Sequence, residues 1–342
     1  WGDTCEVQLR DLSTGTWLWR QTFGPGAPET LSFSPDGARL AVAGRDSTVH
    51  VVNASTGEQL NALHGHEGAV ANVAWSPDGH LLASASNAGN VRLWREPLRS
   101  SQRLAKSEWD SSRYSDYGAV CASSDGRRLA VSHDSTHVSV LAADTLTVVA
   151  ELPDAMRPIS FVDEDRALLT LTPEGQLKKW RLDLAVPAFE EFVLFKEGAA
   201  KKLALSADGH WLATADSSGR IQMWDWLAKK LIFERQAHKV LAWDLAFSRD
   251  GESLVSVGDD RKIKIWETRT GNLRAIWPSN SSTSNVALSS SGDLIAIGLD
   301  QGSVELHTAQ SAVPKHILRT SATRVTSLAF SPDGSRLVCG GP

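Results

Sequence analysis

The sequence lacks the features of a membrane-spanning or secreted precursor. No uninterrupted apolar run approaches the roughly 18 residues that a transmembrane helix needs, and no signal-peptide pattern is visible. The chain begins with Trp1 and not with methionine, so we expect residues 1–342 to be one domain of a longer polypeptide. The net charge is only −5, and acidic and basic residues are interspersed. A binder of duplex DNA normally carries a basic stripe, so this balance argues against that function.

Motifs of catalytic and metal sites are also missing. The three Cys and ten His residues form no CxxC and no HExxH spacing, and His64 and His66 have no third ligand near them. There is no G-x-S-x-G elbow of a serine hydrolase and no Gly-rich phosphate loop. The acidic residues at 163–165 and 259–260 lack the spacing of a calcium loop, so we interpret them as solvated turns. We therefore expect no catalytic residue, no metal and no cofactor.

A repeated pattern of strand and turn fills the chain instead. Each turn joins two apolar strands and is followed by a third, alternating strand such as 263–267 (IKIWE). Proline at the second turn position presets φ, and glycine at the fourth takes a left-handed conformation. Counting a degraded copy at 162–165, eight copies give about 43 residues per unit, a usual repeat length. The seven clear turns of the type Ser-Pro-Asp-Gly are Ser34–Gly37, Ser76–Gly79, Ser123–Gly126, Ser206–Gly209, Ser248–Gly251, Ser289–Gly292 and Ser331–Gly334.

These units resemble the repeats of the WD-repeat (WD40) β-propeller family, and the resemblance covers nearly the whole chain. The family motif runs from a Gly-His pair to a Trp-Asp pair, which Gly65–His66 and Trp224–Asp225 match literally. Other copies depart from it, as Ala237–His238 and Trp94–Arg95 do. The resemblance implies an all-β fold, namely a single closed β-propeller of eight four-stranded blades.

The two ends of the chain complete one repeat between them. Residues 1–23 hold a third strand, a turn and a fourth strand, whereas 325–341 hold a first and a second strand and then stop. In the family such segments join into the last blade, which removes exposed sheet edges. Seven blades are commoner in the family, but the count of eight is complete on both kinds of strand. A slice of a longer array that forms two rings remains an alternative.

One unit alone keeps all four residues of the family's structural tetrad, which are His238, Ser256, Asp260 and Trp266. The resemblance implies a chain of hydrogen bonds from imidazole to indole that fastens the blade. Packed beside an indole, this Ser-His-Asp set leaves no room for a substrate, so we interpret it as structural. In the unit that ends on Trp94, Ala88 stands where the aspartate belongs.

The three cysteines cannot all form disulfides with one another. Cys5 and Cys339 fall on neighbouring strands of one blade, but they are not directly opposite, and a disulfide needs a close approach of the Cα atoms. We therefore expect free, buried thiols and a cytoplasmic protein.

The family uses the mouth of the central channel for protein partners, and the aligned mouth positions give candidate binding residues here. Blades four to six carry cations and one tryptophan there, which is typical of an interface for an acidic or extended peptide. The candidates are Glu29, Arg157, Lys201, Lys239, Trp243 and Arg324. The alternative is that Trp243 lies flat on the channel wall and that the cations are solvated.

The longest irregular stretch, residues 95–117, offers a weaker candidate surface. Exposed aromatic side chains can anchor a partner, and this stretch contains Trp109, Tyr114 and Tyr117. The alternative is an insertion that folds back on its own blade and covers an edge with these rings.

Three functions remain open. The first is a non-catalytic scaffold or sensor domain for a protein partner, a monomeric ring within a larger polypeptide. The use of Ala, Leu and Arg with these turns is similar to WD-repeat arrays of bacterial multidomain signalling or defence proteins, a comparison that rests on the fold alone. The second is a propeller enzyme, such as a lactonase or quinoprotein dehydrogenase, but the mouth positions hold one carboxylate, Glu29. The third is a polyanion or nucleic-acid binder that uses the basic arc.

Overall fold

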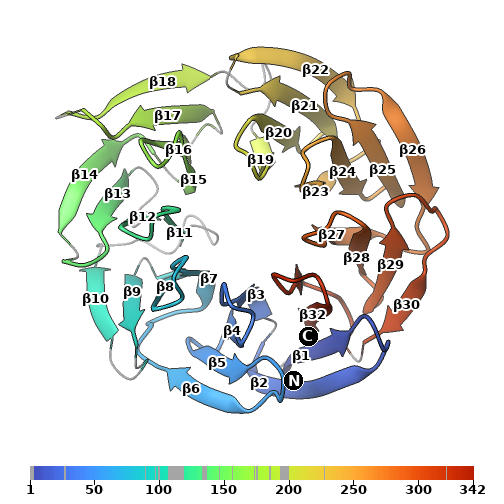
Figure 1. Ribbon diagram of the computed structural model, residues 1–342, viewed down its shortest axis with the longest axis horizontal. Coiled ribbons are helices and arrows are strands. Elements are labelled where there is room, and N and C mark those ends of the chain that lie inside the picture. Colours follow the sequence, from blue (N-terminus) through green and yellow to red (C-terminus); the bar gives the residue numbers. More distant parts are fainter. Residues whose placement is uncertain are drawn as a thin grey trace. The chain divides into compact units, whose positions relative to one another are not determined.

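The computed structural model consists of strands and their connections. It describes residues 4–342 with the exception of 27, 89, 97, 99–100, 107–118, 133–136, 146, 156, 173, 175, 185, 193–199, 227 and 321. In this described part there is no helix that is long and apolar enough to cross a membrane. The strands form eight antiparallel sheets of four strands each, which are the blades of a β-propeller as predicted (Figure 1).

Contacts divide the chain into two compact units, which we call the first half (residues 1–5 and 21–193) and the second half (residues 6–20 and 194–342). In the first half, the first two blades are β3 (Pro28–Phe33), β4 (Arg39–Gly44), β5 (Val49–Asn53) and β6 (Gln59–Leu63), then β7 (Val70–Trp75), β8 (Leu81–Ser86), β9 (Asn90–Arg95) and β10 (Ser101–Lys106). The next two are β11 (Val120–Ala122), β12 (Arg128–Ser132), β13 (His137–Ala142) and β14 (Val148–Pro153), then β15 (Arg157–Val162), β16 (Ala167–Leu171), β17 (Leu177–Arg181) and β18 (Ala188–Phe192).

The second half has the same construction. Its first two blades are β19 (Ala200–Leu205), β20 (Trp211–Asp216), β21 (Arg220–Asp225) and β22 (Lys230–Gln236), then β23 (Ala242–Phe247), β24 (Ser253–Gly258), β25 (Lys262–Glu267) and β26 (Leu273–Pro278). The third is β27 (Thr283–Leu288), β28 (Leu294–Leu299), β29 (Ser303–Thr308) and β30 (His316–Arg319). The last blade combines β31 (Ser327–Phe330) and β32 (Arg336–Gly341) with β1 (Thr4–Asp11) and β2 (Trp17–Pro25).

The last blade joins the two ends of the chain, as the sequence predicted. The segment Glu6–Asp11 of β1 pairs antiparallel with Arg336–Gly341 of β32, so that Gln8 faces Cys339. Cys5, Cys121 and Cys339 are free thiols. Burial is the main reason that the pKa of each thiol is raised to about 12.

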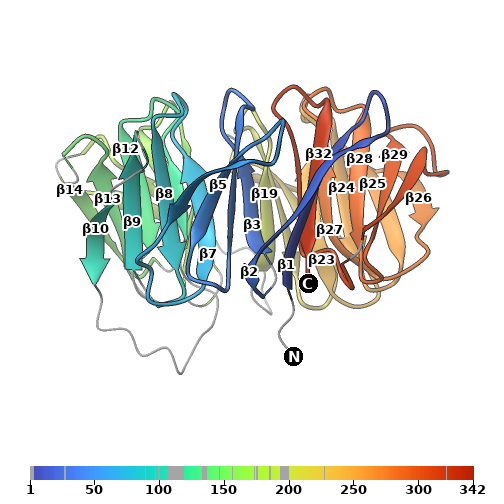
Figure 2. The ribbon, with the colours of Figure 1, turned by 90° about the horizontal axis from the view of Figure 1, so that it is seen from below.

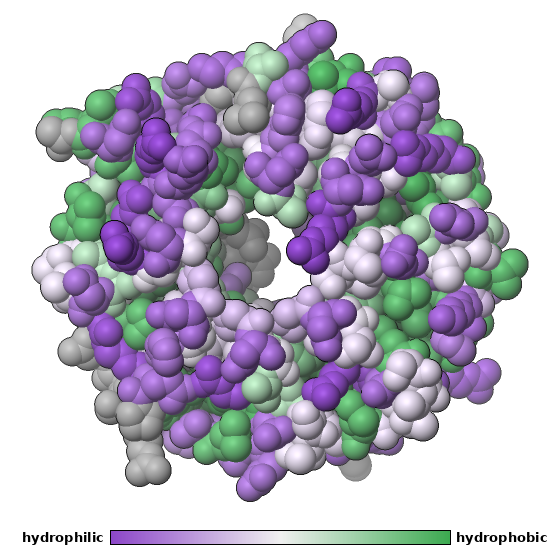
Figure 3. Space-filling view, viewed as in Figure 1, coloured by the Kyte–Doolittle hydropathy of each residue, from purple (hydrophilic) through white to green (hydrophobic). Residues whose placement is uncertain are grey.

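The Ser-Pro-Asp-Gly turns are closed by a repeated set of hydrogen bonds. In the first of them, the Gly37 amide donates to the Ser34 carbonyl at 2.8 Å, and the Ser34 hydroxyl donates to the Asp36 carboxylate at 2.5 Å. Gly37 has a φ of +68°, which glycine adopts without steric cost. Figure 3 views the surface with these turns, where hydrophilic residues predominate and hydrophobic ones are interspersed.

The core of each half lies between adjacent blades. The second strand of a blade is covered on both faces, and in β24 every residue after Ser253 is buried. One core cluster of the second half joins Met223 and Phe233 of one blade to Leu245 and Trp266 of the next. Because both faces of these second strands are buried, apolar and polar residues alternate only weakly along them in the sequence.

In the degraded turn at 162–165, Asp163 and Glu164 are exposed as our prediction of a solvated turn requires, and only Asp165 differs from that prediction. Asp163, Glu164 and Asp165 all have positive φ, and Asp165 is only 5% exposed. Its carboxylate accepts hydrogen bonds from the Ser124 amide (3.0 Å), the Ser124 hydroxyl (2.7 Å) and the Asp125 amide (3.0 Å) of the neighbouring blade. A buried carboxylate needs such donors, so Asp165 connects two blades where other units have glycine.

Candidate functional site

The tetrad blade of the second half is fastened by hydrogen bonds from imidazole to indole. His238 Nδ1 lies 2.7 Å from the Asp260 carboxylate, and His238 Nε2 lies 2.9 Å from the Ser256 hydroxyl. The Trp266 indole N–H donates to the same hydroxyl at 2.9 Å. The His238 side chain is fully buried, and burial lowers its pKa although Asp260 opposes this shift. A neutral imidazole that is closed off from solvent fits a structural network, and no substrate can reach it.

The first half contains a second network of this kind, which the sequence showed only in part. His66 contacts the Ser84 hydroxyl at 2.6 Å, and Trp94 donates to that hydroxyl at 2.8 Å. The imidazole's other nitrogen lies 2.6 Å from Asn90 Oδ1, so Asn90 performs the role that we sought at Ala88. The signal for it was a lone polar residue at the start of an apolar strand, two positions beyond the aligned aspartate.

The loop Ala237–Leu241, which connects β22 to β23, is held from several sides. The amides of Ala237 and His238 both donate to the Gly219 carbonyl, at 3.0 and 2.9 Å. The Gln236 amide group donates to the His238 carbonyl at 2.7 Å, and the Lys264 ammonium donates to the Ala237 carbonyl. The side chains of the next two residues point away from these contacts: Lys239 is exposed, and Val240 is 54% exposed. The loop therefore presents a cation and an apolar side chain on a fixed backbone.

Trp243 follows this loop on β23, and its surroundings are built from three polar side chains. Its indole N–H donates to the Asp259 carboxylate, and the Arg324 guanidinium carbon lies 5.9 Å from the ring centroid. Arg324 also forms an ion pair with Asp300 at 3.0 Å. Trp243 is half-buried, so a part of it remains available for contact. The candidate Arg324 is therefore ion-paired with Asp300 beside the Trp243 ring.

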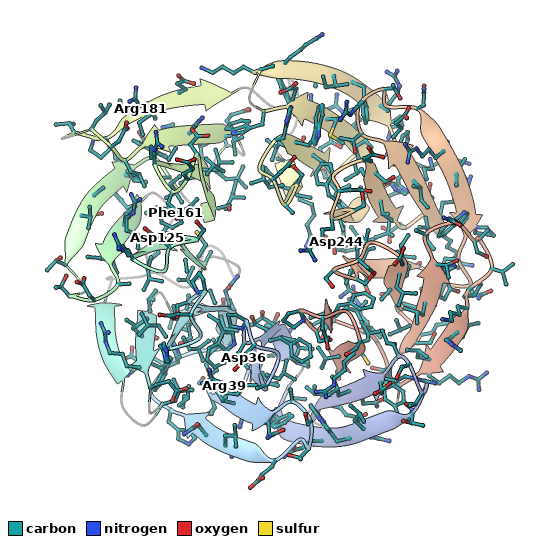
Figure 4. All side chains as sticks on the ribbon, in the orientation of Figure 1. Asp36, Arg39, Asp125, Phe161, Arg181 and Asp244 are labelled. Atoms are coloured by element: carbon teal, nitrogen blue, oxygen red, sulfur yellow. The ribbon has the colours of Figure 1, made fainter. Side chains whose placement is uncertain are left out.

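The strand β23 also carries Asp244, whose position Figure 4 shows. Its two oxygens accept the Leu245 amide at 3.0 Å and the Val286 amide of the next blade at 3.1 Å. Lys202 on β19 lies 4.0 Å from the carboxylate. Burial is the main reason that the pKa of Asp244 is raised, and the charge of Lys202 opposes this shift.

We call the edge of the second half that contains Lys239 and Trp243 the loop surface. It is formed by the loops that follow the outer strands and by the turns that connect the second strand of a blade to the third. These are residues 237–241, 279–282, 320, 322–326, 217–219, 259–261 and 300–302, with the strand ends beside them. Figure 2 shows the strands of the second half from the side, where β24 and β25 run between its two edges.

The carboxylates of the loop surface all have partners. Besides Asp244, Asp259, Asp260 and Asp300, Asp216 pairs with Arg220 at 2.8 Å, and Glu234 accepts a hydrogen bond from Gln222 at 2.6 Å. Several cations at this edge have no ion pair within the described residues. They are Arg235, Lys239, Arg261, Lys262 and Arg319. The loop surface thus combines hydrogen-bonded or ion-paired carboxylates with five cations that have no ion pair in the described part of the chain, and it contains the tryptophan Trp243.

The remaining predicted residues do not join this surface in the described structure. The side chains of Arg157 and Lys201 lie outside the described residues, as do Trp109, Tyr114 and Tyr117. Glu29 belongs to the first half, where it is paired with Arg45 at 3.1 Å. Among the described residues no group of three or more His, Cys, Asp or Glu side chains is arranged to hold a metal ion.

Sequence reasoning missed Val240, Arg261 and Lys262 as parts of this surface. Arg261 has a φ of +57° and is exposed in the turn after β24, and Lys262 begins β25. Alignment of channel positions considers one residue of each inner strand and leaves out these turns. The signal for Arg261 and Lys262 was their place directly after the tetrad aspartate, Asp260.

A family model described as WD domain, G-beta repeat matches five segments of the chain. They are residues 21–53, 57–95, 197–225, 229–267 and 312–341. The first ends on β5 and the second on β9, so the matches follow the blades of the structure.

Similar proteins have diverse names. Apoptotic protease-activating factor 1 of Rattus norvegicus is 24% identical over 339 residues, which is 98% of this chain and 26% of the relative. Protein transport protein sec13 of Aspergillus fumigatus is 24% identical over 74% of this chain and 95% of the relative. Actin-interacting protein 1 of Drosophila melanogaster is 23% identical over 92% of this chain and 53% of the relative. The chain spans about a quarter of the first of these relatives.

Proposed function

The chain belongs to the WD-repeat family, and on that premise we propose that it is a non-catalytic scaffold that binds an extended, acidic segment of a protein partner at the loop surface. WD-repeat propellers of the relatives are protein-interaction scaffolds in general. The partner of this chain is inferred from its own residues, since the names of the relatives describe protease activation, transport and actin interaction.

The observation that carries this proposal is that the loop surface holds exposed cations without ion pairs in the described part of the chain, whereas its carboxylates are engaged as hydrogen-bond acceptors or in ion pairs. Lys239 and Arg261 are exposed and available to an acidic side chain of a partner. Tryptophan with neighbouring cations is a frequent anchor in protein interfaces, and Val240 adds apolar contact area. An extended segment suits a surface of short loops, which offers successive contacts and no deep cleft.

The proposal has a cellular part as well. We propose that the chain is the recognition part of a larger multidomain signalling or defence protein, that it acts as a monomeric propeller, and that it resides in the cytoplasm. The composition supports a bacterial source, the partial coverage of two relatives supports a larger polypeptide, and the free thiols support a reducing compartment.

The test is the affinity for a short fluorescein-labelled oligoglutamate, measured by fluorescence anisotropy at several salt concentrations. We expect binding that weakens as salt rises, and a loss of about tenfold or more when Lys239→Glu and Arg261→Glu are combined. The matched control is Lys315→Glu, which changes charge in the loop between β29 and β30, at the opposite edge of the half. Equal losses for Lys315→Glu, or no binding by the parent, would reject the acidic partner.

The same cations support a second candidate, a nucleic acid. A single-stranded oligonucleotide with the same number of charges, used in the same assay, separates the two. Tighter binding of the oligonucleotide, with the same loss in the Lys239→Glu, Arg261→Glu variant, would replace the peptide by a nucleic acid as the ligand.

A further inference from the structure

The residues that carry the proposed function surround the one tetrad that contains an aspartate. Two contacts connect the loop 237–241 to the turn 259–261: His238 bonds to Asp260 at 2.7 Å, and the Asp259 amide donates to the Leu241 carbonyl at 3.2 Å. The turn also contacts the strand that follows the loop, because the Trp243 indole donates to the Asp259 carboxylate. A shift of either segment therefore moves the other. Lys239 and Val240 stand on one segment and Arg261 on the other.

Close packing beneath this pair of segments allows little adjustment. A Cβ atom on Gly258 would lie 2.7 Å from the His238 ring carbon Cγ and 2.8 Å from the Leu241 carbonyl, so only glycine fits there. Lys264 reaches past the tetrad to the Ala237 carbonyl, and burial is the main reason that its pKa is lowered, which the charge of Asp260 opposes. Asp260 thus contacts the loop through His238, and its negative charge stabilises the ammonium of Lys264.

The first half supplies a natural comparison, because the His66 blade has the same architecture without the surface features. Its network uses neutral Asn90, and its turn repeats the contact between segments, with the Asn87 amide donating to the Ala69 carbonyl at 2.8 Å. The residues aligned with Lys239, Val240 and Trp243 are Glu67, Gly68 and Ala71. The Arg92 guanidinium donates to the Gly65 carbonyl at 2.6 Å, as Lys264 does to Ala237. A network with asparagine in place of aspartate therefore fastens a blade that lacks equivalents of Lys239 and Trp243 on its surface.

We propose that His238 and Asp260 are positioning residues for the binding of an acidic partner, and that they set the relative placement of Lys239, Trp243 and Arg261. This inference rests on the proposed function. It assigns to this tetrad a role in recognition in addition to its role in fastening the blade. The Asn90 network has only the second role.

The physical reason lies in the donor that the tetrad satisfies. Removal of the Asp260 carboxylate leaves the buried Nδ1–H of His238 without an acceptor, and a buried donor is expensive to leave unpaired. The ring is then expected to turn toward another acceptor and to take the loop with it. An asparagine at 260 still accepts the hydrogen bond through its amide oxygen, as Asn90 does for His66.

The experiment compares Asp260→Ala, Asp260→Asn and Asn90→Ala in the oligoglutamate assay, with thermal unfolding of each variant as the second measurement. We expect Asp260→Ala to weaken binding about tenfold and Asp260→Asn to remain within about threefold of the parent. Asn90→Ala is expected to lower thermal stability by a similar amount and to leave binding within about twofold.

The outcomes separate this inference from the proposed function. If the parent binds and the Lys239→Glu, Arg261→Glu variant does not, but folded Asp260→Ala binds as the parent does, the positioning role is wrong and the proposed function stands. The positioning role is also wrong if Asn90→Ala weakens binding as much as Asp260→Ala. If Asp260→Ala does not fold, Asp260→Asn decides the question, because its amide oxygen still accepts the hydrogen bond from His238. A loss of affinity above about tenfold in Asp260→Asn would then refute positioning through this hydrogen bond. Absence of binding by the parent rejects the proposed function itself.

Discussion

The replacement of Asp165 by glycine is a direct test of how adjacent blades are connected. Seven other turns have glycine at this place, so repeat statistics favour Asp165→Gly as a stabilising change. It relieves a positive φ of 65°, a gain of roughly 1 kcal/mol. It also removes three hydrogen bonds to a carboxylate, each of which contributes about 1.5–3 kcal/mol when it is buried. Ser124 and Asp125 are exposed residues, so water replaces part of this loss.

The expected balance is a destabilisation of about 1–3 kcal/mol, measured by chemical denaturation of the parent and Asp165→Gly. Asp165→Asn is the control, because its amide oxygen keeps one acceptor while φ is unchanged. We expect it to lie between the parent and the glycine variant. A glycine variant that is as stable as the parent, or more stable, would show that the hydrogen bonds of Asp165 contribute no more than the relief of its backbone.

Three further predictions concern thiols, acid and glycine. Because burial raises the pKa of Cys5, Cys121 and Cys339 to about 12, we expect no reaction of the buried Cys5 and Cys339 with Ellman's reagent at pH 8, slow reaction of the half-buried Cys121, and three thiols per chain after unfolding. Serine hydroxyls lower the pKa of Asp36, Asp78, Asp125, Asp250 and Asp333, to about 2 for Asp333, so their contribution to stability is present above pH of about 4 and is lost between about 4 and 2. Unfolding of Asp333→Asn should show a shallower loss over that window, and an unchanged slope would contradict this. Gly302→Ala should be about 1–3 kcal/mol more destabilising than Gly209→Ala, because the added Cβ lies 1.6 Å from the Ala322 carbonyl in the first and meets nothing in the second, while both have positive φ.

The repeat pattern was sufficient to predict the fold, including the number of blades and the joining of the chain ends. The reason is that each unit repeats the same turn, so that errors in one copy are corrected by the others. Local substitutions could not be predicted in this way. Asn90 takes the role of a missing aspartate from a position two residues away, and only the path of the backbone shows that its side chain reaches His66.

The candidate site was predicted less completely than the fold. Alignment proposed Trp243, Lys239 and Arg324 as mouth residues, but it gave no information on ion pairs such as that of Arg324 with Asp300. Such pairs connect different blades and depend on side-chain geometry. The acidic cluster 163–165 shows the same limit, because the burial of Asp165 depends on donors of a distant turn.

The central claim is that the loop 237–241 contacts a protein partner. Its most direct test is site-specific photo-crosslinking in cells of the source organism, with benzoylphenylalanine at Val240 and, in a second variant, at the aligned Gly68 of the first half. We predict that Val240 gives a cross-linked protein that is lost when Lys239→Glu is added, and that Gly68 gives none. Equal products from both positions, or products only from Gly68, would contradict the assignment of the binding surface to this loop.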